Sequence, residues 1–244
     1  MRAALLLLIG LGIAREGHAH EFWVQPSRFQ IAPGAALSVE LQVGDGPMRQ
    51  RSPIPPHRIT RFDAFGPRGE LIDVRASLAA AAKHDVTFDA PGTYVLTVAT
   101  DNRAYSHRER YGRAAKSIVQ VGVASKQSQA HVTKPLGLPL EIVPVVSPYS
   151  ELRPTSLPVR IVYEGYALPG VHVKLYNLEQ DLAPVDVRRT DHTGLATFPM
   201  PASGSWLISV VWTKRLENSP DADFETIFAS LTFGSAPGSD RTNR

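Results

Sequence analysis

The amino-acid sequence predicts an all-β fold made of two β-sandwich domains in tandem. Three observations support this prediction. Apolar and polar residues alternate in short runs along most of the chain, which is the period of half-buried strands. In the second half of the chain these runs recur roughly every 10 to 15 residues with turn residues between them, a spacing typical of antiparallel sandwiches. The one stretch that favours a helix, 73–85, is short and rich in alanine.

The first half of the chain contains four alternating runs. They are ALSVELQV (36–43), RITRFDAFG (58–66), GTYVLTVAT (92–100) and KSIVQVG (116–122). Pro91 and Gly92 give a turn signal just before the third run. We expect the four runs to belong to a first sandwich domain over residues 20–122.

A polar stretch without apolar periodicity, 123–136, predicts a linker. Strand patterns resume after it, at 138–146, 157–165, 171–179, 194–200, 205–213 and 225–233. We expect these six runs to form a second sandwich domain over residues 137–234. The tail, 235–244, is polar and is expected to be disordered.

The start of the chain has the pattern of a secretory signal peptide. Arg2 is followed by an apolar run of 12 residues, 3–14, shorter than the roughly 20 residues of a membrane span. Small residues permit cleavage after Ala19, with a polar segment before the cut, or after Ala14. We favour Ala19, which assigns 1–19 to the signal peptide; an uncleaved anchor is the alternative. We expect the mature chain to be exported and to have no membrane span.

Composition and missing motifs exclude several functions. The chain has no cysteine, so neither a disulfide nor a thiolate metal site can form. Its formal net charge is only +3 and no basic stripe with interleaved aromatics occurs, so nucleic-acid binding is not indicated. A phosphate-binding loop, a Gly-x-Ser-x-Gly elbow and a His-Glu-x-x-His pair are also missing. Only Met48 and Met200 remain after cleavage, which excludes a methionine-rich copper(I) site.

Cleavage after Ala19 makes His20 the first residue. Its α-amine and its imidazole then form a pair of nitrogen ligands on one residue. With another imidazole they would make a planar, nitrogen-rich site, which suits copper(II) or nickel(II) better than zinc. The alternative is that His20 is a frayed end, and that only Phe22 and Trp23 matter here, as core anchors.

We expect the second imidazole to come from His107, with Glu109 as a further ligand. Both lie in a segment that we expect to be a loop, and loops on a rigid scaffold often carry function. The neighbouring arginines weigh against a cation at this place. The alternative for Arg108, Glu109 and Arg110 is a surface ion pair or an arginine fork that binds an anion.

The other histidines fit structural roles. His131 lies in the expected linker, and His172 alternates with valines and so points to the polar face of a strand. His192 occupies a Thr-Asp-His-Thr-Gly turn. His57 follows two prolines and His84 precedes a turn. None of these five is a predicted ligand.

Three carboxylates near the end of the chain, Asp221, Asp223 and Glu225, stand at alternate positions. Oxygen ligands of this kind suit calcium or magnesium. The series is too short for a calcium-binding helix-loop-helix, so we favour an acidic loop that leads into the last strand.

Several blocks of the chain resemble known families. AHEFWVQPSRF (19–29), RERYGRAAKSIVQVG (108–122), GLPLEIVP (137–144), YEG (163–165) and DADFETIFASLTF (221–233) occur in this order. Together they resemble a bacterial periplasmic family of domains of unknown function, described as the periplasmic component of nickel/cobalt (ABC-type cobalt) transport systems. The resemblance implies a periplasmic location and an envelope metal transporter or a TonB-dependent receptor system as partner.

The second half also resembles a sandwich domain. YEGYALPGVHVKLYN (163–177) and RTDHTGLATFPMPASGSWLISV (189–210) are similar to transthyretin-like or carboxypeptidase-regulatory-like domains. Both domains are therefore expected to be immunoglobulin-like or transthyretin-like. The chain departs from the first family at Trp212, where that resemblance implies a histidine.

The sequence leaves three functions open. The first is a non-enzymatic periplasmic protein that binds nickel, cobalt or copper through His20, His107 and Glu109. The second is an envelope interaction module without a metal. The third is a copper enzyme built on the amino-terminal histidine, which would need an open copper ion and a redox partner.

Overall fold

The computed structural model describes residues 21–79, 84–100, 104–106, 108–123, 129–150, 154–201 and 203–235 of the 244-residue chain. Strands dominate this part of the chain, so the all-β prediction is confirmed. The described helices are two short 3-10 turns, η1 (Pro56–Arg58) and η2 (Arg75–Ala79). The stretch 73–85, which favoured a helix, contains the short η2 turn, and the strand β7 (His84–Thr87) begins at its end.

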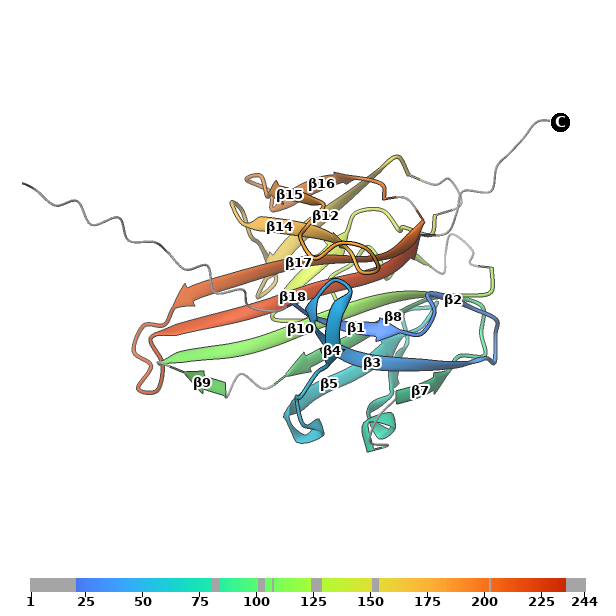
Figure 1. Ribbon diagram of the computed structural model, residues 1–244, viewed down its shortest axis with the longest axis horizontal. Helices are drawn as coiled ribbons and strands as arrows, with labels where there is room; N and C mark the ends of the chain where they lie inside the picture. The colour runs from blue at the N-terminus through green and yellow to red at the C-terminus, as the bar shows by residue number, and fades with distance from the viewer. Residues whose placement is uncertain are drawn as a thin grey trace, which may run out of the picture.

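A ten-stranded sheet forms the middle layer (Figure 1). Eight strands follow one another across it: β15 (Asp186–Arg189), β14 (His172–Asn177), β17 (Gly204–Arg215), β18 (Phe224–Ser235), β10 (Glu109–Val121), β8 (Gly92–Thr100), β5 (Ile59–Phe65) and β6 (Leu71–Asp73). The two others, β2 (Gln30–Ile31) and β9 (Ala104–Ser106), pair with β10.

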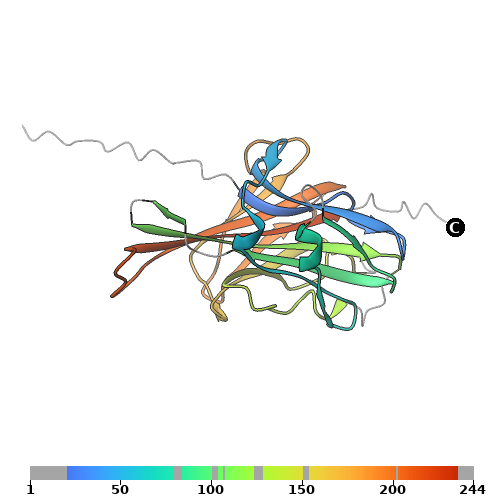
Figure 2. The same ribbon diagram turned by 90° about the horizontal axis from the view of Figure 1, so that it is seen from below.

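Two four-stranded sheets complete the fold. The first contains β1 (Glu21–Pro26), β3 (Ala36–Asp45), β4 (Met48–Arg51) and β7. The second contains β11 (Leu140–Pro144), β12 (Ser156–Tyr163), β13 (Tyr166–Ala167) and β16 (Leu195–Pro199). Figure 2 shows the blue strands of the first sheet and the yellow strands of the second on opposite sides of the middle sheet.

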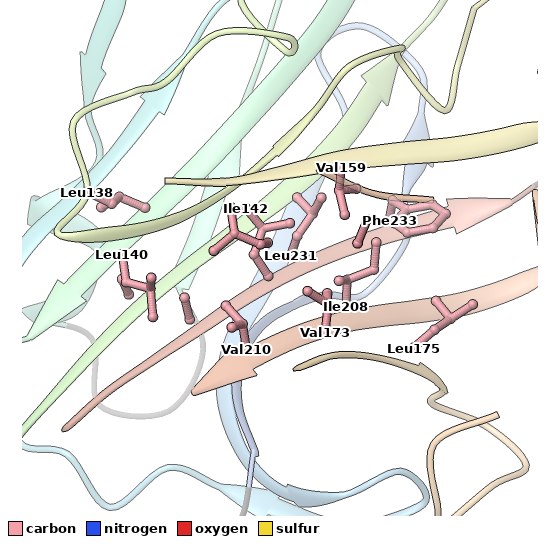
Figure 3. Close-up of a cluster of buried hydrophobic side chains, with 14 of the residues drawn as sticks. Leu138, Leu140, Ile142, Val159, Val173, Leu175, Ile208, Val210, Leu231 and Phe233 are labelled. Carbon is pink, nitrogen blue, oxygen red and sulfur yellow. The ribbon is translucent and has the colours of Figure 1, made fainter. Parts of the chain in front are cut away.

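Two large hydrophobic cores and a smaller cluster around Trp23 lie between these layers, and β10 contributes to both large cores. Successive side chains of a strand point to opposite faces. Accordingly Ile118 belongs to the core beneath the second small sheet, while Val119 belongs to the core beneath the first. Figure 3 shows the larger core, where Ile142 and Val159 face Ile208 and Leu231 of the middle sheet.

The pairing of β10 with β18 joins the two halves of the chain. The two strands are parallel and stay in register from Glu109 opposite Phe224 to Ile118 opposite Phe233. The strand spacing predicted a purely antiparallel arrangement. This prediction is wrong for β10 and β18, which run parallel. The middle sheet is continuous across the two predicted domains, and the division at 123–136 stays a prediction.

A buried ion pair reinforces the same junction. Lys116 Nζ of β10 lies 2.9 Å from Glu141 Oε1 of β11, and the two side chains are 2% and 1% exposed. The Glu141 carboxylate also accepts hydrogen bonds from the backbone N–H groups of Leu136, Gly137 and Leu138. Burial lowers the pKa of Lys116, and the attraction of Glu141 opposes this shift.

The segment expected to be a polar linker is partly buried in the structure. His131 and Val132 are 7% and 2% exposed, and Val132 belongs to the larger core. The segment turns on itself, because Val132 N–H donates to Gln129 O at 3.0 Å. Neither ring nitrogen of His131 has a hydrogen-bond partner among the described residues. Burial therefore lowers the pKa of His131, while the nearby Thr93 backbone and the charge of Glu70 oppose the shift.

His131 should make the protein sensitive to acid. Its pKa in the folded state lies below its ordinary value of 6.5, so the unfolded chain binds more protons as the pH falls below that value and stability decreases. We expect the wild type to lose more unfolding free energy between about pH 7.5 and about pH 5 than His131→Leu does. Urea unfolding at several pH values, followed by circular dichroism, measures the difference. Parallel losses in the two proteins would contradict this role of His131.

Candidate functional site

The strand β1 is held firmly from its first residue. Phe22, Trp23 and Val24 are 2%, 0% and 0% exposed, which confirms Phe22 and Trp23 as core anchors. β1 pairs with β3, so that Glu21 lies opposite Gly44. Val24 O accepts a 2.7 Å hydrogen bond from the Thr232 hydroxyl of the middle sheet. The described part of β1 is therefore fixed in the fold from Glu21 onward.

Glu21 brings a carboxyl group into this interior. Glu21 is 4% exposed, and its Oε1 accepts a 3.1 Å hydrogen bond from the Tyr176 hydroxyl. Burial raises the pKa of Glu21, while Ser209, Lys174 and Tyr176 oppose this shift. The Ser209 hydroxyl lies close to the carboxyl, but it makes no hydrogen bond of normal geometry within the described residues.

A pocket of about 300 Å³ is lined by residues of the neighbouring strands β14 and β17 and by Gly170 and Val171 before β14. His172, Lys174 and Ser209 are among the residues that line it. On β14, Val173 and Leu175 point into the larger core. His172, Lys174 and Tyr176 alternate with them and therefore share the face on which β1 lies.

The predicted ligands His20 and His107 lie outside the described residues. Glu109 lies in β10 and not in a loop, because the strand begins at this residue. Both of its carboxylate oxygens are occupied: Tyr111 OH donates at 2.7 Å, and Thr226 Oγ1 donates to the other oxygen.

Glu109 also lies some distance from β1. Arg113 stands four residues further along β10, which is about 13 Å in a strand. The Arg113 guanidinium contacts β1, at 6.0 Å from the centre of the Phe22 ring. Glu109 as a metal ligand stays a prediction.

Asp223, just before β18, and Glu225, the second residue of β18, each form an ion pair. Arg108 holds Asp223 through two hydrogen bonds, Nε to Oδ2 at 2.8 Å and Nη2 to Oδ1 at 2.9 Å. This pair raises the pKa of Arg108 and lowers that of Asp223. Glu225 lies 3.8 Å from Lys214. The described residues contain no group of three or more histidines and carboxylates arranged to hold a metal ion by themselves.

Trp212 occupies the position where the resemblance implied a histidine. Its side chain lies on the opposite face of β17 from that of Ser209 and packs against the larger core. The centre of its ring lies 6.4 Å from that of Tyr163. Its side chain therefore points away from the face that carries β1. Trp212 nevertheless lines the same pocket as His172 and Ser209.

These observations define an all-β protein with open, sandwich-like sheets and a pocket lined by residues of β14 and β17. The chain belongs to a family with the description "Domain of unknown function (DUF4198)", which matches residues 17–214. No curated protein matches the chain. Among the described residues, no helix has the length and apolar character needed to cross a membrane.

Some solved structures align with most of the chain at low similarity. The D0-D1 domain of intimin is 13% identical, covers 88% of this chain and 97% of its own, and has a TM-score of 0.22. The fibronectin(III)-like modules of Clostridium thermocellum CbhA are 12% identical, with 91% and 98% coverage and a TM-score of 0.22. Murine CEACAM1b is 9% identical, with 89% and 99% coverage and a TM-score of 0.22.

Proposed function

We propose that this protein binds a divalent transition metal ion (nickel, cobalt or copper) in the bacterial periplasm, without catalysing a reaction. Export processing after Ala19 frees the α-amine of His20, and this amine and the imidazole bind the ion together. The ion is cargo, received from or passed to an envelope metal transporter or a TonB-dependent receptor system. The resemblance to the periplasmic component of nickel/cobalt transport systems supports the cargo and the partner.

The observation that carries the proposal is the burial of β1 up to its first residue. Phe22 and Trp23 are fixed in two different hydrophobic clusters, and Glu21 is hydrogen-bonded to Tyr176. A chelating residue attached to such a strand loses little freedom when it binds an ion, because its neighbours are already ordered. A frayed lead-in would make the same chelate weaker.

The chemistry near Glu21 also fits a nitrogen-bound ion. The chain offers no thiolate, so imidazole and amine nitrogens are its strongest ligands for nickel(II) or copper(II). Glu21 and Asp45 place carboxyl groups near this end of β1 and balance the charge of Lys174. His107 and Glu109 remain candidates for the further ligands.

The proposal extends to the fold of the second half. We propose a transthyretin-like sandwich over residues 137–234. The antiparallel pairing of β12 with both β11 and β16, packed against β14 and β17, supports this topology.

A metal-free interaction module is the second candidate, and one feature of the middle sheet favours it. β15 is the last strand of that sheet, and Val185 and Val187 on or beside it are 48% and 46% exposed. The edge of a terminal strand can pair with an extended segment of another protein.

The chelate is tested with mature protein that begins at His20. Mass spectrometry of the exported protein first establishes whether this is the natural first residue. Calorimetry then measures the Kd for nickel(II), cobalt(II) and copper(II) in three forms: unmodified, acetylated at the α-amine, and His20→Ala. We expect acetylation and His20→Ala each to weaken binding at least about tenfold. Equal binding by all three forms, or an exported chain that begins elsewhere, would overturn the proposal and leave the interaction module.

A further inference from the structure

We infer that a second pocket of this protein binds a small organic carboxylate, with the charge held by cationic side chains and the body of the ligand against apolar walls. The pocket has a volume of about 280 Å³ and is lined by residues of the turn after β5 and of the segment 129–136. The inference goes beyond the proposed function and does not depend on it, because none of the residues invoked takes part in the proposed chelate.

The pocket forms where two turns of the chain meet. In the turn between β5 and β6, Gly69 N–H donates to Gly66 O at 2.8 Å. Gly69 has a φ of +80°, which favours glycine, and a Cβ at this residue would lie 4.0 Å from the Cβ of His131. The segment 129–136 also turns on itself, because Lys134 N–H donates to His131 O at 3.3 Å. The two turns therefore lie against each other and enclose the pocket.

The apolar walls of the pocket are held in place from outside it. Phe65 and Leu136 line the pocket and pack against the larger core. Arg61 donates from Nη1 to Leu136 O at 2.8 Å, and its guanidinium carbon lies 5.3 Å from the centre of the Phe65 ring. The backbone N–H of Leu136 also donates to Glu141 Oε1 at 2.7 Å. Walls that are already ordered lower the entropic cost of binding a ligand.

The charge of the pocket favours an anion. Arg68 and Lys134 both line it, and among the described lining residues no side chain is a carboxylate. Glu70 lies nearby, with its Oε1 3.9 Å from Arg68 Nη2, and its Oε2 accepts a 2.8 Å hydrogen bond from the Arg68 backbone N–H. One carboxylate does not balance two cations, so the pocket keeps an excess of positive charge that attracts an anion.

His131 supplies a buried donor that lacks a partner. The residue is 7% exposed and lines the pocket, and neither of its ring nitrogens has a hydrogen-bond partner within the described part of the chain. A buried polar group without a partner costs free energy. Burial also lowers the pKa of His131 and so favours the neutral ring, which carries one N–H donor. A carboxylate oxygen in the pocket gives this N–H its missing acceptor.

The combination of groups selects the class of anion. Phe65 and Leu136 offer apolar surface beside the cations Arg68 and Lys134. A carboxylate with an apolar body matches both kinds of surface, whereas inorganic phosphate is polar on every side. Pockets for small molecules usually begin at about 300 Å³, so a volume near that limit suits a small acid.

Calorimetry of the exported protein with four probes tests the class of ligand. The probes are benzoate, acetate, benzamide and inorganic phosphate. We expect benzoate to bind with a Kd below about 1 mM. Acetate lacks the apolar ring and benzamide lacks the charge, so each should bind at least about tenfold more weakly. Phosphate binding as tight as that of benzoate, or no benzoate binding up to about 10 mM, would overturn the inference.

Single substitutions test the place of binding. Arg68→Gln and Lys134→Gln each remove one exposed cation, and we expect each to weaken benzoate binding about two- to fivefold. Arg28→Gln removes an exposed arginine between β1 and β2 and should leave the Kd unchanged. His131→Leu removes the buried donor and should weaken binding at least about tenfold. Thermal melts check the fold of each variant, and the two exposed cations keep the test decisive if His131→Leu unfolds.

Nuclear magnetic resonance of the histidine rings gives a readout that a purely structural role would not move. The ring signals of His131 are identified as those lost in His131→Leu. We expect benzoate to shift these signals in the unmodified protein, while the ring signals of the exposed His192 stay in place. Benzoate binding that leaves the His131 signals unmoved, or that is equally tight in Arg68→Gln, Lys134→Gln and Arg28→Gln, would place the ligand elsewhere and overturn the inference.

Discussion

Glu141→Ala is expected to lower the free energy of unfolding by about 3–5 kcal/mol, the cost of breaking a buried ion pair on one side. The variant leaves the Lys116 ammonium, 2% exposed, without its partner at 2.9 Å. It also removes the acceptor of three backbone N–H groups, those of Leu136, Gly137 and Leu138. A buried charge and three unpaired donors act together, so this change should exceed most single substitutions.

Lys116→Met is the matched variant for the same pair. It removes the other partner but leaves Glu141 with its three backbone donors, so we expect a smaller loss than for Glu141→Ala. Urea unfolding of both variants and of the double variant gives the coupling energy of the pair. Equal losses in the two single variants would show that the backbone contacts of Glu141 contribute nothing. A loss below about 1 kcal/mol for Glu141→Ala would contradict its role as a buried anchor.

The strands were predictable where apolar and polar residues alternate in the sequence. GTYVLTVAT coincides with β8 residue for residue, and β3, β5, β12 and β17 overlap the runs expected for them. In β3 and β5 this alternation matches alternating burial, whereas in β8 both faces are buried and the small polar threonines lie inside. Strands of two to four residues, such as β2, β4 and β13, are too short to show a period and were missed.

The first part of β10 was missed for a different reason. Glu109, Arg110, Tyr111 and Arg113 read as a charged loop, but they lie in a strand between β9 and β18. Their side chains find partners across the sheet, as the bonds of Glu109 to Tyr111 and Thr226 show. Which strands lie beside β10 depends on the tertiary fold, and so does the parallel direction of β18. The local sequence pattern records neither.

The candidate site was predictable in part. The sequence identified Phe22 and Trp23 as anchors and placed His172 on the polar face of its strand, and both predictions are confirmed. The burial of Glu21 was not predicted. Glu21 and Trp23 stand two residues apart in a strand, so their side chains lie on the same face. The pocket at Ser209 could not be predicted, because it depends on how β14 and β17 pair in the middle sheet.

Trp23→Ala is expected to destabilise the protein by about 3–5 kcal/mol, the range for removing a large buried aromatic side chain. Trp23 is fully buried and packs with Tyr176, Leu178 and Leu207, so its loss leaves a cavity between β1 and the middle sheet. The same contacts fix the strand that begins at Glu21. Urea unfolding followed by far-UV circular dichroism measures the change without depending on the fluorescence of the lost indole.

Gln25→Ala separates packing from polar contact in this cluster. The Gln25 side chain accepts a 3.1 Å hydrogen bond from the Trp23 indole N–H, and the variant removes this acceptor while it keeps the ring. We expect a loss of about 1–3 kcal/mol, the cost of a buried donor without a partner. A Trp23→Ala variant that loses no more than Gln25→Ala would show that the indole N–H, and not the packed ring, holds β1 in place. Because the proposed chelate depends on an ordered β1, packing by the ring is the physical link between the core and the metal site.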